Sequence, residues 1–300
     1  MTTSTGTGNA MVERIILTTL VAGGVYALLA IGFSLIFGNA RVINMAHTGF
    51  FMLAAYGLYY FMRKLGLDAA PAIVITVPTV TAVGILAYRF LINPIREHLA
   101  AVLLMTVAIA IAFQELMSTI FSSLYWSIPP LVAGFTEILG VRVLNQHLLI
   151  LGVVALVIVI VWLILSKTKL GIALRATAQD AEVANLMGIS VPRTLMITMG
   201  IATGLAAIAA VVVAPIWTIY PFMWSPPLVM VLVIVVLGGL GSVKGAIIGA
   251  FIIALVENLV SNLMPSYSYL KVVFAILAMV IVLTVRPGGL FGVIFEEERL

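Results

Sequence analysis

The sequence from Ile15 to Phe37 reads IILTTLVAGGVYALLAIGFSLIF, a run of 23 residues without a charged side chain. An α-helix needs about 20 apolar residues to cross the hydrocarbon core of a membrane, so this run predicts a membrane-spanning helix. The run is longer than the apolar core of a secretory signal peptide, which has about 7–15 residues. We therefore expect it to be retained as a membrane helix.

The composition of the whole chain agrees with this interpretation. Hydrophobic residues make up 63% of the 300 positions and charged residues 9%, with a mean hydropathy of +1.26. A soluble domain carries about 25% charged residues, so the composition excludes a water-soluble globule and a disordered chain. A net charge of +4 is too small to indicate a nucleic-acid partner. The absence of cysteine excludes disulfides, thiolate metal sites and cysteine nucleophiles.

Further apolar runs predict an all-α, polytopic membrane protein of eight or nine transmembrane helices. The runs are Ile15–Phe37, Met45–Met62, Pro71–Leu91, Leu99–Phe121, Gln146–Leu165, Thr194–Ala214, Pro227–Leu240, Gly245–Asn262 and Leu270–Val285. Small and polar residues interrupt the pattern at Gly38–Asn44 and at Gly238–Lys244. These interruptions indicate broken or re-entrant helices, which occur at membrane depth where the backbone lines a cavity or is buried in protein. Two ordinary tight helix hairpins are the alternative.

The basic residues indicate how the chain is oriented, because Lys and Arg gather in cytoplasmic loops. If the loop Ser166–Arg193 is cytoplasmic, ten of the fifteen basic residues fall on its side. This predicts a cytoplasmic C-terminus. The side of the N-terminus stays open, because the count of basic residues on the two sides is the same whether segment 38–62 spans the membrane or is re-entrant. The expected organisation is a polar tail 1–14, a single transmembrane domain 15–292 that includes the cytoplasmic loop 166–193, and a charged cytoplasmic tail 293–300.

The loop 166–193 contains an alanine-rich stretch that predicts a short amphipathic helix. Gly188 suits the end of a helix and Pro192 prevents its continuation. An apolar stripe is expected from Ala173, Ala176, Ala184 and Met187. Such a helix docks into a partner protein or lies on the lipid surface. We favour a protein partner, because a helix on the lipid surface usually has more basic residues and larger apolar anchors.

Polar groups inside the predicted spans are the candidates for a solute pathway, because an unpaired charge in lipid is costly. The candidates are Asn44, His47 and Thr48 at the first interruption, Gly239 and Ser242 at the second, and Glu115 and Glu257 within later spans. A broken helix offers N–H groups to a carboxylate, and a glutamate offers acceptors to an ammonium group. The alternatives are that each glutamate reaches interfacial water, that His47 is packed, and that the glycines serve helix packing. The three histidines are too dispersed for a metal site.

Seven blocks of the sequence, taken in order, resemble the permease subunits of branched-chain amino-acid importers of the ATP-binding-cassette (ABC) class. They are Gly24–Gly32, Phe37–Gly38, Val42–His47, Asn93–Arg96, the loop from Gly171 to Ile189, Leu237–Gly249 and Arg286–Gly292. The blocks cover nearly the whole chain. The sequence departs from the family at Met230–Leu232, where Lys-Ala-Phe is common, and at Thr48, where Gly is usual.

The resemblance implies a pore-forming subunit with several partners. It pairs with a second permease as a homodimer or heterodimer, with two cytoplasmic ATPase subunits and with a periplasmic solute-binding protein, in the inner membrane. The expected ATPase-coupling residues are Leu170, Gly171, Arg175, Ala176, Asp180, Ala184 and Gly188. The chain itself lacks a phosphate-binding G-x-x-x-x-G-K-[ST] loop, so we expect no cofactor here and ATP on the partner subunits.

The function expected from the sequence is therefore transport rather than catalysis. The cargo implied by the resemblance is a branched-chain or related small amino acid. The alternatives are a member of the same family that carries urea, amides or another small solute, and a secondary transporter driven by an ion gradient. An intramembrane enzyme is disfavoured, because no catalytic grouping is evident.

Overall fold

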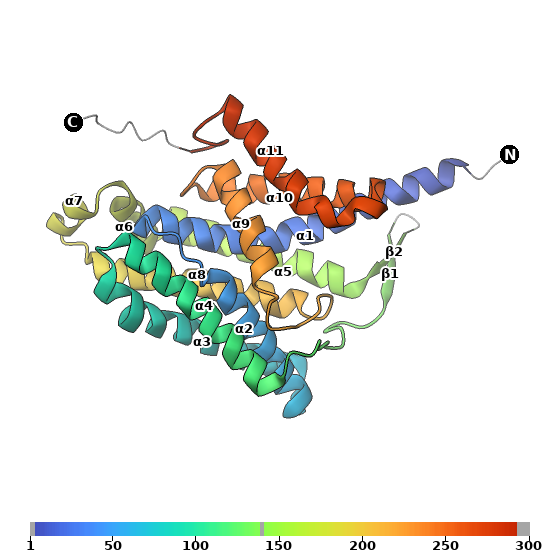
Figure 1. Cartoon of the computed structure of the whole chain (residues 1–300), viewed down its shortest axis with the longest axis horizontal. Helices are drawn as coiled ribbons and strands as arrows, with labels where there is room; N and C mark the ends of the chain where they lie inside the picture. Colours follow the sequence, from blue (N-terminus) through green and yellow to red (C-terminus); the bar gives the residue numbers. More distant parts are fainter. Residues whose placement is uncertain (1–3, 139–140, 293–300) are drawn as a thin grey trace.

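The computed structural model describes residues 4–138 and 141–292, and it confirms an all-α membrane fold (Figure 1). The α-helices are α1 Ser4–Ala40, α2 His47–Tyr59, α3 Ala69–Ala87, α4 Leu99–Phe121, α5 Asn145–Lys167, α6 Lys169–Gln179, α7 Ala181–Leu186, α8 Val191–Val213, α9 Ser225–Gly238, α10 Val243–Leu263 and α11 Lys271–Val285. Short π- or 3-10 segments are η1 Tyr60–Lys64, η2 Tyr88–Ile92, η3 Asn93–Ile95 and η4 Pro265–Leu270. Strands β1 Phe135–Ile138 and β2 Val141–Leu144 form an antiparallel hairpin in which Phe135 pairs with Leu144.

Each of the nine predicted apolar runs contains a helix. Within the described residues, seven helices are long and apolar enough to cross a membrane. The two shorter ones are α2, with 13 residues, and α9, with 14. Each lies beside one of the two predicted interruptions, which indicates that these interruptions shorten the helices next to them. Helix α1 begins at Ser4 and so extends into the expected polar tail 1–14, whereas the expected tail 293–300 lies outside the described residues.

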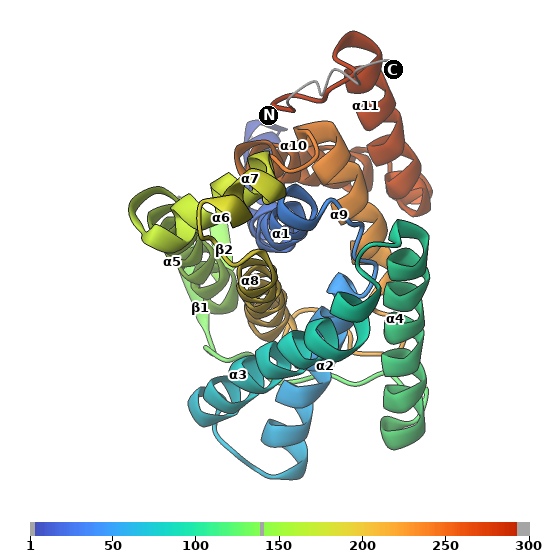
Figure 2. The same cartoon turned by 90° about the vertical axis from the view of Figure 1, so that its left-hand side faces the viewer.

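Helix α1 occupies the middle of the bundle (Figure 2). It contacts α5, α8, α9 and α10, and its residues from Val25 to Phe33 are almost completely buried. Close approach depends on small residues: a Cβ on Gly24 would lie 3.1 Å from the side chain of Val154 in α5. Helices α3, α4, α5 and α11 instead leave most of their side chains half-buried or exposed. In a chain this hydrophobic, such exposed apolar faces are suited to lipid or to a second membrane subunit.

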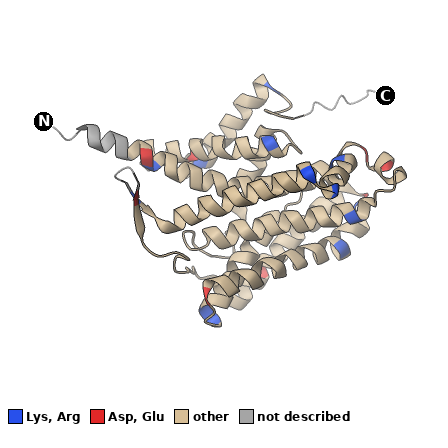
Figure 3. Cartoon of the chain, turned by 180° about the vertical axis from the view of Figure 1, so that it is seen from behind, with Lys and Arg blue, Asp and Glu red and all other residues tan. Residues whose placement is uncertain are grey.

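The basic residues are concentrated at one end of the bundle. Lys and Arg gather around α6, α7 and the neighbouring helix ends (Figure 3). The C-terminal end of α1 also lies here, because residues 39–41 and 177–182 line one cavity of about 390 Å³. The β1–β2 hairpin and the N-terminal part of α1 lie at the opposite end (Figure 1). This distribution follows the predicted separation of basic residues, and we call the two ends the loop end and the hairpin end.

The loop 166–193 forms two helices instead of the single helix that the alanine-rich stretch suggests. The Thr168 side chain caps α6 by accepting from Gly171 N–H at 3.2 Å. The Asp180 carboxylate caps α7 by accepting from the N–H groups of Glu182 and Val183 at 2.9 and 3.0 Å. Gly188, with φ +85°, ends α7 as predicted, and its N–H donates to the carbonyl of Asn185. The aspartate therefore breaks the stretch by capping a second helix.

Candidate functional site

The first interruption places the start of α2 deep inside the bundle. Nε2 of His47, the first residue of α2, lies 3.0 Å from the carbonyl oxygen of Leu29 in α1. Leu29 stands eleven residues before Ala40, the last residue of α1. At 1.5 Å per residue this is about 16 Å, or half the thickness of the hydrocarbon core. The chain thus returns from the loop end in a non-helical segment and begins α2 near the middle of the membrane.

Side chains satisfy the backbone at this interruption. Asn44 Oδ1 accepts from Ala46 N–H at 3.0 Å, and its amide nitrogen lies 3.4 Å from the sulfur of Met199 in α8. The N–H of Met45 donates to the Thr106 hydroxyl of α4 at 3.2 Å. Non-helical backbone is tolerated at membrane depth when protein groups bond it in this way. The predicted broken helix is thus present in the structure and supported from two neighbouring helices.

His47 and Thr48 are completely buried and carry polar atoms that are not used by the fold. A carbonyl oxygen accepts hydrogen bonds and cannot donate, so Nε2 of His47 must donate to Leu29. Nδ1 of His47 and the Thr48 hydroxyl have no hydrogen-bond partner among the described residues. Buried polar atoms are nearly always paired, so two unpaired ones on adjacent residues mark a functional candidate. The ring of His47 also meets Phe33 edge-on, at 6.1 Å between ring centres.

A cavity of about 280 Å³, here called the inner cavity, leads from this interruption toward the loop end. Asn44 and Met199 line it near α2, while Ala181 of α7 and Arg96 line it toward the loop end. A neighbouring cavity of about 390 Å³ lies between residues 39–41 and 177–182. The loop helices therefore form part of the wall of both cavities.

The second interruption is held together by backbone contacts. The Ser242 hydroxyl caps α10 by accepting from Gly245 N–H at 3.1 Å. Gly239 has φ +102° and lies directly against Gly292, where a Cβ would collide. The N–H groups of Leu290 and Phe291 donate to the last carbonyls of α9 at 2.9 Å. Gly239 and Ser242 line neither the inner cavity nor the neighbouring cavity between residues 39–41 and 177–182. Their contacts agree with the packing alternative.

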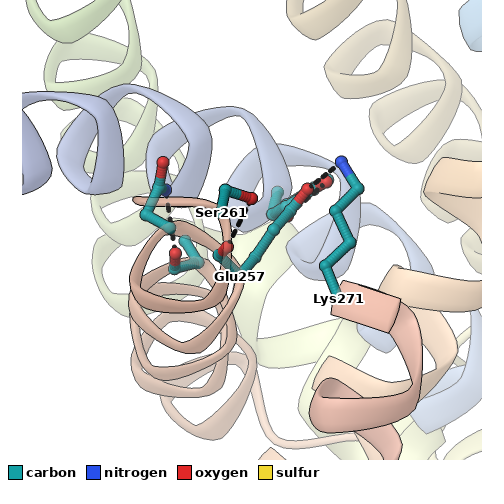
Figure 4. Close-up of polar contacts among 6 residues, drawn as sticks. Glu257, Ser261 and Lys271 are labelled. Carbon is teal, nitrogen blue, oxygen red and sulfur yellow. Dashed lines mark hydrogen bonds and ion pairs between the residues drawn. The ribbon is translucent and has the colours of Figure 1, made fainter. Parts of the chain in front are cut away.

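Glu257 lies toward the hairpin end, away from the first interruption. It is 8% exposed, and its two carboxylate oxygens have separate partners, of which Lys271 is labelled in Figure 4. Oε2 accepts from the Tyr26 hydroxyl at 2.9 Å, and Oε1 lies 2.6 Å from Nζ of Lys271. These side chains line an open cavity of about 630 Å³, here called the outer cavity, together with Trp217. Sequence reasoning missed Tyr26 and Lys271 as partners of Glu257.

Glu115 is separate from both places. It is exposed on α4, where its Oε1 accepts from the Gln114 amide at 3.0 Å. The oxygen of the same Gln114 amide accepts from the Trp224 indole N–H at 2.9 Å. Glu115 lines none of the three cavities. The structure therefore brings together Asn44, His47 and Thr48, and leaves Glu115 and Glu257 apart from them.

The predicted coupling residues divide between the inside and the surface of the loop. Gly171 and Ala184 are buried, and Ala176 is half-buried. Leu170, Arg175, Asp180 and Gly188 are exposed, and Arg175 donates to the carbonyl of Leu165. The expected stripe of Ala173, Ala176, Ala184 and Met187 is not a single face, because the chain bends at Asp180.

The two most exposed apolar side chains of the loop, Leu186 and Met187, are on or beside α7. Leu186 is 85% exposed and Met187 is 78% exposed, with Val183 beside them at 53%. We call these three residues the α7 patch. Met187 was predicted as part of a stripe, whereas Val183 and Leu186 were missed. A patch of this kind at the tip of a loop suits a protein partner.

The chain is similar to known proteins along almost its whole length. A profile of the family described as "Branched-chain amino acid transport system / permease component" matches residues 15–283. The "High-affinity branched-chain amino acid transport system permease protein BraD" of Pseudomonas aeruginosa is 28% identical over 288 residues, covering 91% of this chain and 93% of that protein. The permease protein LivH of the same description, from Escherichia coli K12, is 29% identical over 286 residues, covering 90% and 92%.

Among solved structures, the chain is similar to "PsaBC from Streptococcus pneumoniae in complex with Fab". The sequence identity is 16% and the TM-score is 0.49, with 89% of this chain and 90% of that chain covered.

Proposed function

The chain belongs to the family of permease components of branched-chain amino acid transport systems, and from this premise we propose that it is the pore-forming subunit of an ATP-driven importer for a small aliphatic amino acid. It is thus a transport subunit and not an enzyme. The proposed partners are a second permease, identical or different, two cytoplasmic ATPase subunits and a periplasmic solute-binding protein. The proposed location is the inner membrane, with the loop end and the C-terminus on the cytoplasmic side.

The contact between the loop helices and the inner cavity carries this proposal. Ala181 of α7 and Asn44 of the broken helix line the same cavity. A partner that moves α7 therefore changes the shape of the space that leads to the start of α2. Coupling requires that the ATPase binds two conformations of the permease with different affinity. A contact between α7 and the cavity wall allows this, because the position of α7 then differs with the shape of the cavity.

The α7 patch is the proposed attachment point of the ATPase. Val183, Leu186 and Met187 are apolar and exposed, while the Asp180 cap holds α7 in helical form. Burying large apolar side chains in a groove of a partner stabilises a helix-in-groove complex. The coupling residues expected from the sequence then have two roles. Gly171 and Ala184 hold the loop together, whereas Leu170, Arg175 and Gly188 lie where a partner can reach them.

Reconstitution tests the proposal directly. The chain is placed in lipid vesicles with its partner permease, ATPases and binding protein, and uptake of radiolabelled leucine is measured with and without ATP. Uptake that requires ATP supports the proposal. Uptake by this chain alone, driven by a proton or sodium gradient, would overturn it in favour of a secondary transporter.

The attachment point is tested by exchanging apolar residues for serine. The variant Leu186→Ser with Met187→Ser is expected to lose most of the co-purifying ATPase. Leu124→Ser is the matched control, because Leu124 is also apolar and is 60% exposed but lies in the loop between α4 and β1. Equal loss of ATPase in both variants would contradict the assignment to α7.

A further inference from the structure

The inner cavity is lined mainly by apolar side chains, and one positively and one negatively charged residue also line it. Its apolar wall comes from several helices and includes Ile36, Ile92, Val102, Val191, Leu195 and Met199. Arg96 and Glu97 are adjacent in sequence and both line the cavity. At about 280 Å³ the cavity lies at the small end of ligand pockets, which suits a molecule of few heavy atoms.

Two neighbouring residues of the cavity, Tyr88 and Arg96, have donor groups that can reach a ligand. The Tyr88 hydroxyl and Nη1 of Arg96 are buried atoms without a hydrogen-bond partner of ordinary geometry among the described residues. Tyr88 is 6% exposed, and the Arg96 guanidinium lies beside its hydroxyl as a hydrogen-bond donor, so the Tyr88 O–H and the other Arg96 N–H groups stay available to a ligand. Both residues line the cavity. Two donors of this kind, one of them positively charged, are complementary to a carboxylate.

Acceptor groups are present as well. Glu97 is exposed at the cavity and carries a carboxylate, and Oδ1 of Asn39 is a buried acceptor without a partner in the described part of the chain. Both residues line the cavity with Arg96. An ammonium group donates three hydrogen bonds and is favoured by a nearby negative charge. The cavity therefore offers a complement to each charge of a zwitterion and an apolar wall for its side chain.

We infer that the inner cavity is a binding site for a zwitterionic aliphatic amino acid on its way through the permease. Arg96 and Tyr88 bind the carboxylate, Glu97 and Asn39 accept from the ammonium group, and the aliphatic side chain contacts Leu195 and Met199. This inference rests on the proposed function and names the residues that recognise the cargo. Asn44 lines the same cavity at the end nearest α2, three residues before His47.

The experiment uses the absence of native cysteine, because a single introduced cysteine is then the sole thiol of this chain. Val191→Cys places a thiol in the cavity wall, where Val191 is half-buried. Ser190→Cys is the matched control, because Ser190 is the preceding residue, is exposed and does not line the cavity. The assembled complex in vesicles is treated with a methanethiosulfonate reagent at the loop end, and the labelling rate of this chain is measured with increasing leucine.

Leucine is expected to slow labelling of Val191→Cys several-fold and to leave Ser190→Cys unchanged. Two leucine analogues test the two charges: 4-methylpentanoate lacks the ammonium group and 3-methylbutylamine lacks the carboxylate. Each is expected to need at least ~10-fold higher concentration for the same protection, because a hydrogen bond to a charged group is lost. Equal protection by 4-methylpentanoate would identify a simple anion site and overturn the inference.

Two substitutions in the Val191→Cys background assign the residues. Arg96→Gln is expected to abolish protection by leucine. Tyr88→Phe removes one hydroxyl and keeps the ring, so it is expected to weaken protection about 2- to 10-fold. If leucine protects neither cysteine while ATP-dependent uptake persists, the site is wrong and the proposed function stands. If ATP-dependent uptake is itself absent from the complete complex, the proposed function fails instead.

Discussion

Gly241, in the turn between α9 and α10, lies against Gly38 near the end of α1, so that a Cβ on Gly241 would stand 3.1 Å from the Cα of Gly38. This contact joins the two interruptions of the membrane helices at the loop end. Gly241 also has φ +81°, a conformation that L-residues with a side chain rarely adopt. Close approach and backbone conformation therefore both require glycine at this position.

Gly241→Ala is consequently expected to destabilise the protein by about 1–2 kcal/mol, the cost of a left-handed residue with a Cβ. Gly152→Ala is the control, because Gly152 is within α5 and a Cβ there would meet nothing within 4 Å. That change is expected to be neutral or to stabilise the helix by about 0.5–1 kcal/mol. Thermal unfolding in detergent measures both. Equal unfolding temperatures for the two variants would contradict the requirement for glycine at position 241.

A second prediction concerns His47. His47→Leu removes the donor to Leu29 and the unpaired Nδ1 while it keeps an apolar side chain in the buried space. Removing one partner of a buried hydrogen bond costs about 1–3 kcal/mol, and we expect the lower end of this range because the Leu29 carbonyl stays within helix α1. If the imidazole serves the pathway, leucine uptake by the complete complex falls at least ~10-fold while the unfolding temperature stays within a few degrees. His47→Leu that retains full uptake would assign the ring to packing alone.

The helices of the membrane domain were predictable because their information is local. The run Leu99–Phe121 contains enough apolar residues to span a membrane, and α4 has these same bounds. The short π-segments Tyr60–Lys64 and Tyr88–Ile92 have no comparable pattern and were not expected. In the loop, helix propensity favoured one continuous helix, but the side chain of Asp180 bonds the N–H groups ahead of it and starts a new one.

Of the candidate site, the part that was predictable is the part that is contiguous in sequence. Asn44, His47 and Thr48 lie within five residues, and a break in an apolar pattern marks them together. Glu257 was recognised as an intramembrane charge, but its partner Tyr26 is 231 residues away. Tyr88 and Arg96 meet Asn39 through the packing of separate helices. Such pairings arise from tertiary packing and leave no periodic pattern in a single sequence.

A third prediction concerns the two roles of the Asp180 side chain, as the cap of α7 and as a negative charge in the loop. Asp180→Ala removes the acceptor for two N–H groups of α7 and is expected to destabilise this helix by about 1 kcal/mol. Asp180→Asn keeps an acceptor without the charge and is expected to keep α7 intact. Hydrogen exchange of residues 181–187 measures the cap, and ATP-dependent uptake measures coupling. Rapid hydrogen exchange of residues 181–187 in both variants would contradict the expectation that an uncharged asparagine can cap α7.

The reversal of charge in the loop gives the corresponding test of coupling. Arg175→Glu and Asp180→Lys are each expected to reduce ATP-dependent uptake while the chain still inserts into the membrane. Asp180→Asn provides the comparison, because it changes the charge with little effect on the helix. Unchanged uptake in both reversed variants would indicate that the loop is an ordinary solvated segment.

The last prediction concerns the pair of Glu257 and Lys271, which joins α10 to α11 beside the outer cavity. Lys271→Met leaves the buried Glu257 carboxylate with the Tyr26 hydroxyl as its remaining side-chain partner among those described above. Breaking a fully buried pair costs about 3–5 kcal/mol. Because the Lys271 side chain is 43% exposed, water screens the pair, and we expect a smaller loss of about 1–2 kcal/mol.

A double variant shows whether the loss of stability comes from the unpaired Glu257 charge or from the missing Lys271 side chain. The double variant Glu257→Gln with Lys271→Met removes the buried charge and is expected to recover most of the stability, because an uncompensated carboxylate is the main cost. The exposed pair of Arg142 and Glu137 in the hairpin is the control, and Arg142→Met is expected to change stability by less than about 0.5 kcal/mol. Unfolding temperatures in detergent give all three values. A Lys271→Met variant as stable as the unaltered chain would show that the ion pair does not hold α10 to α11.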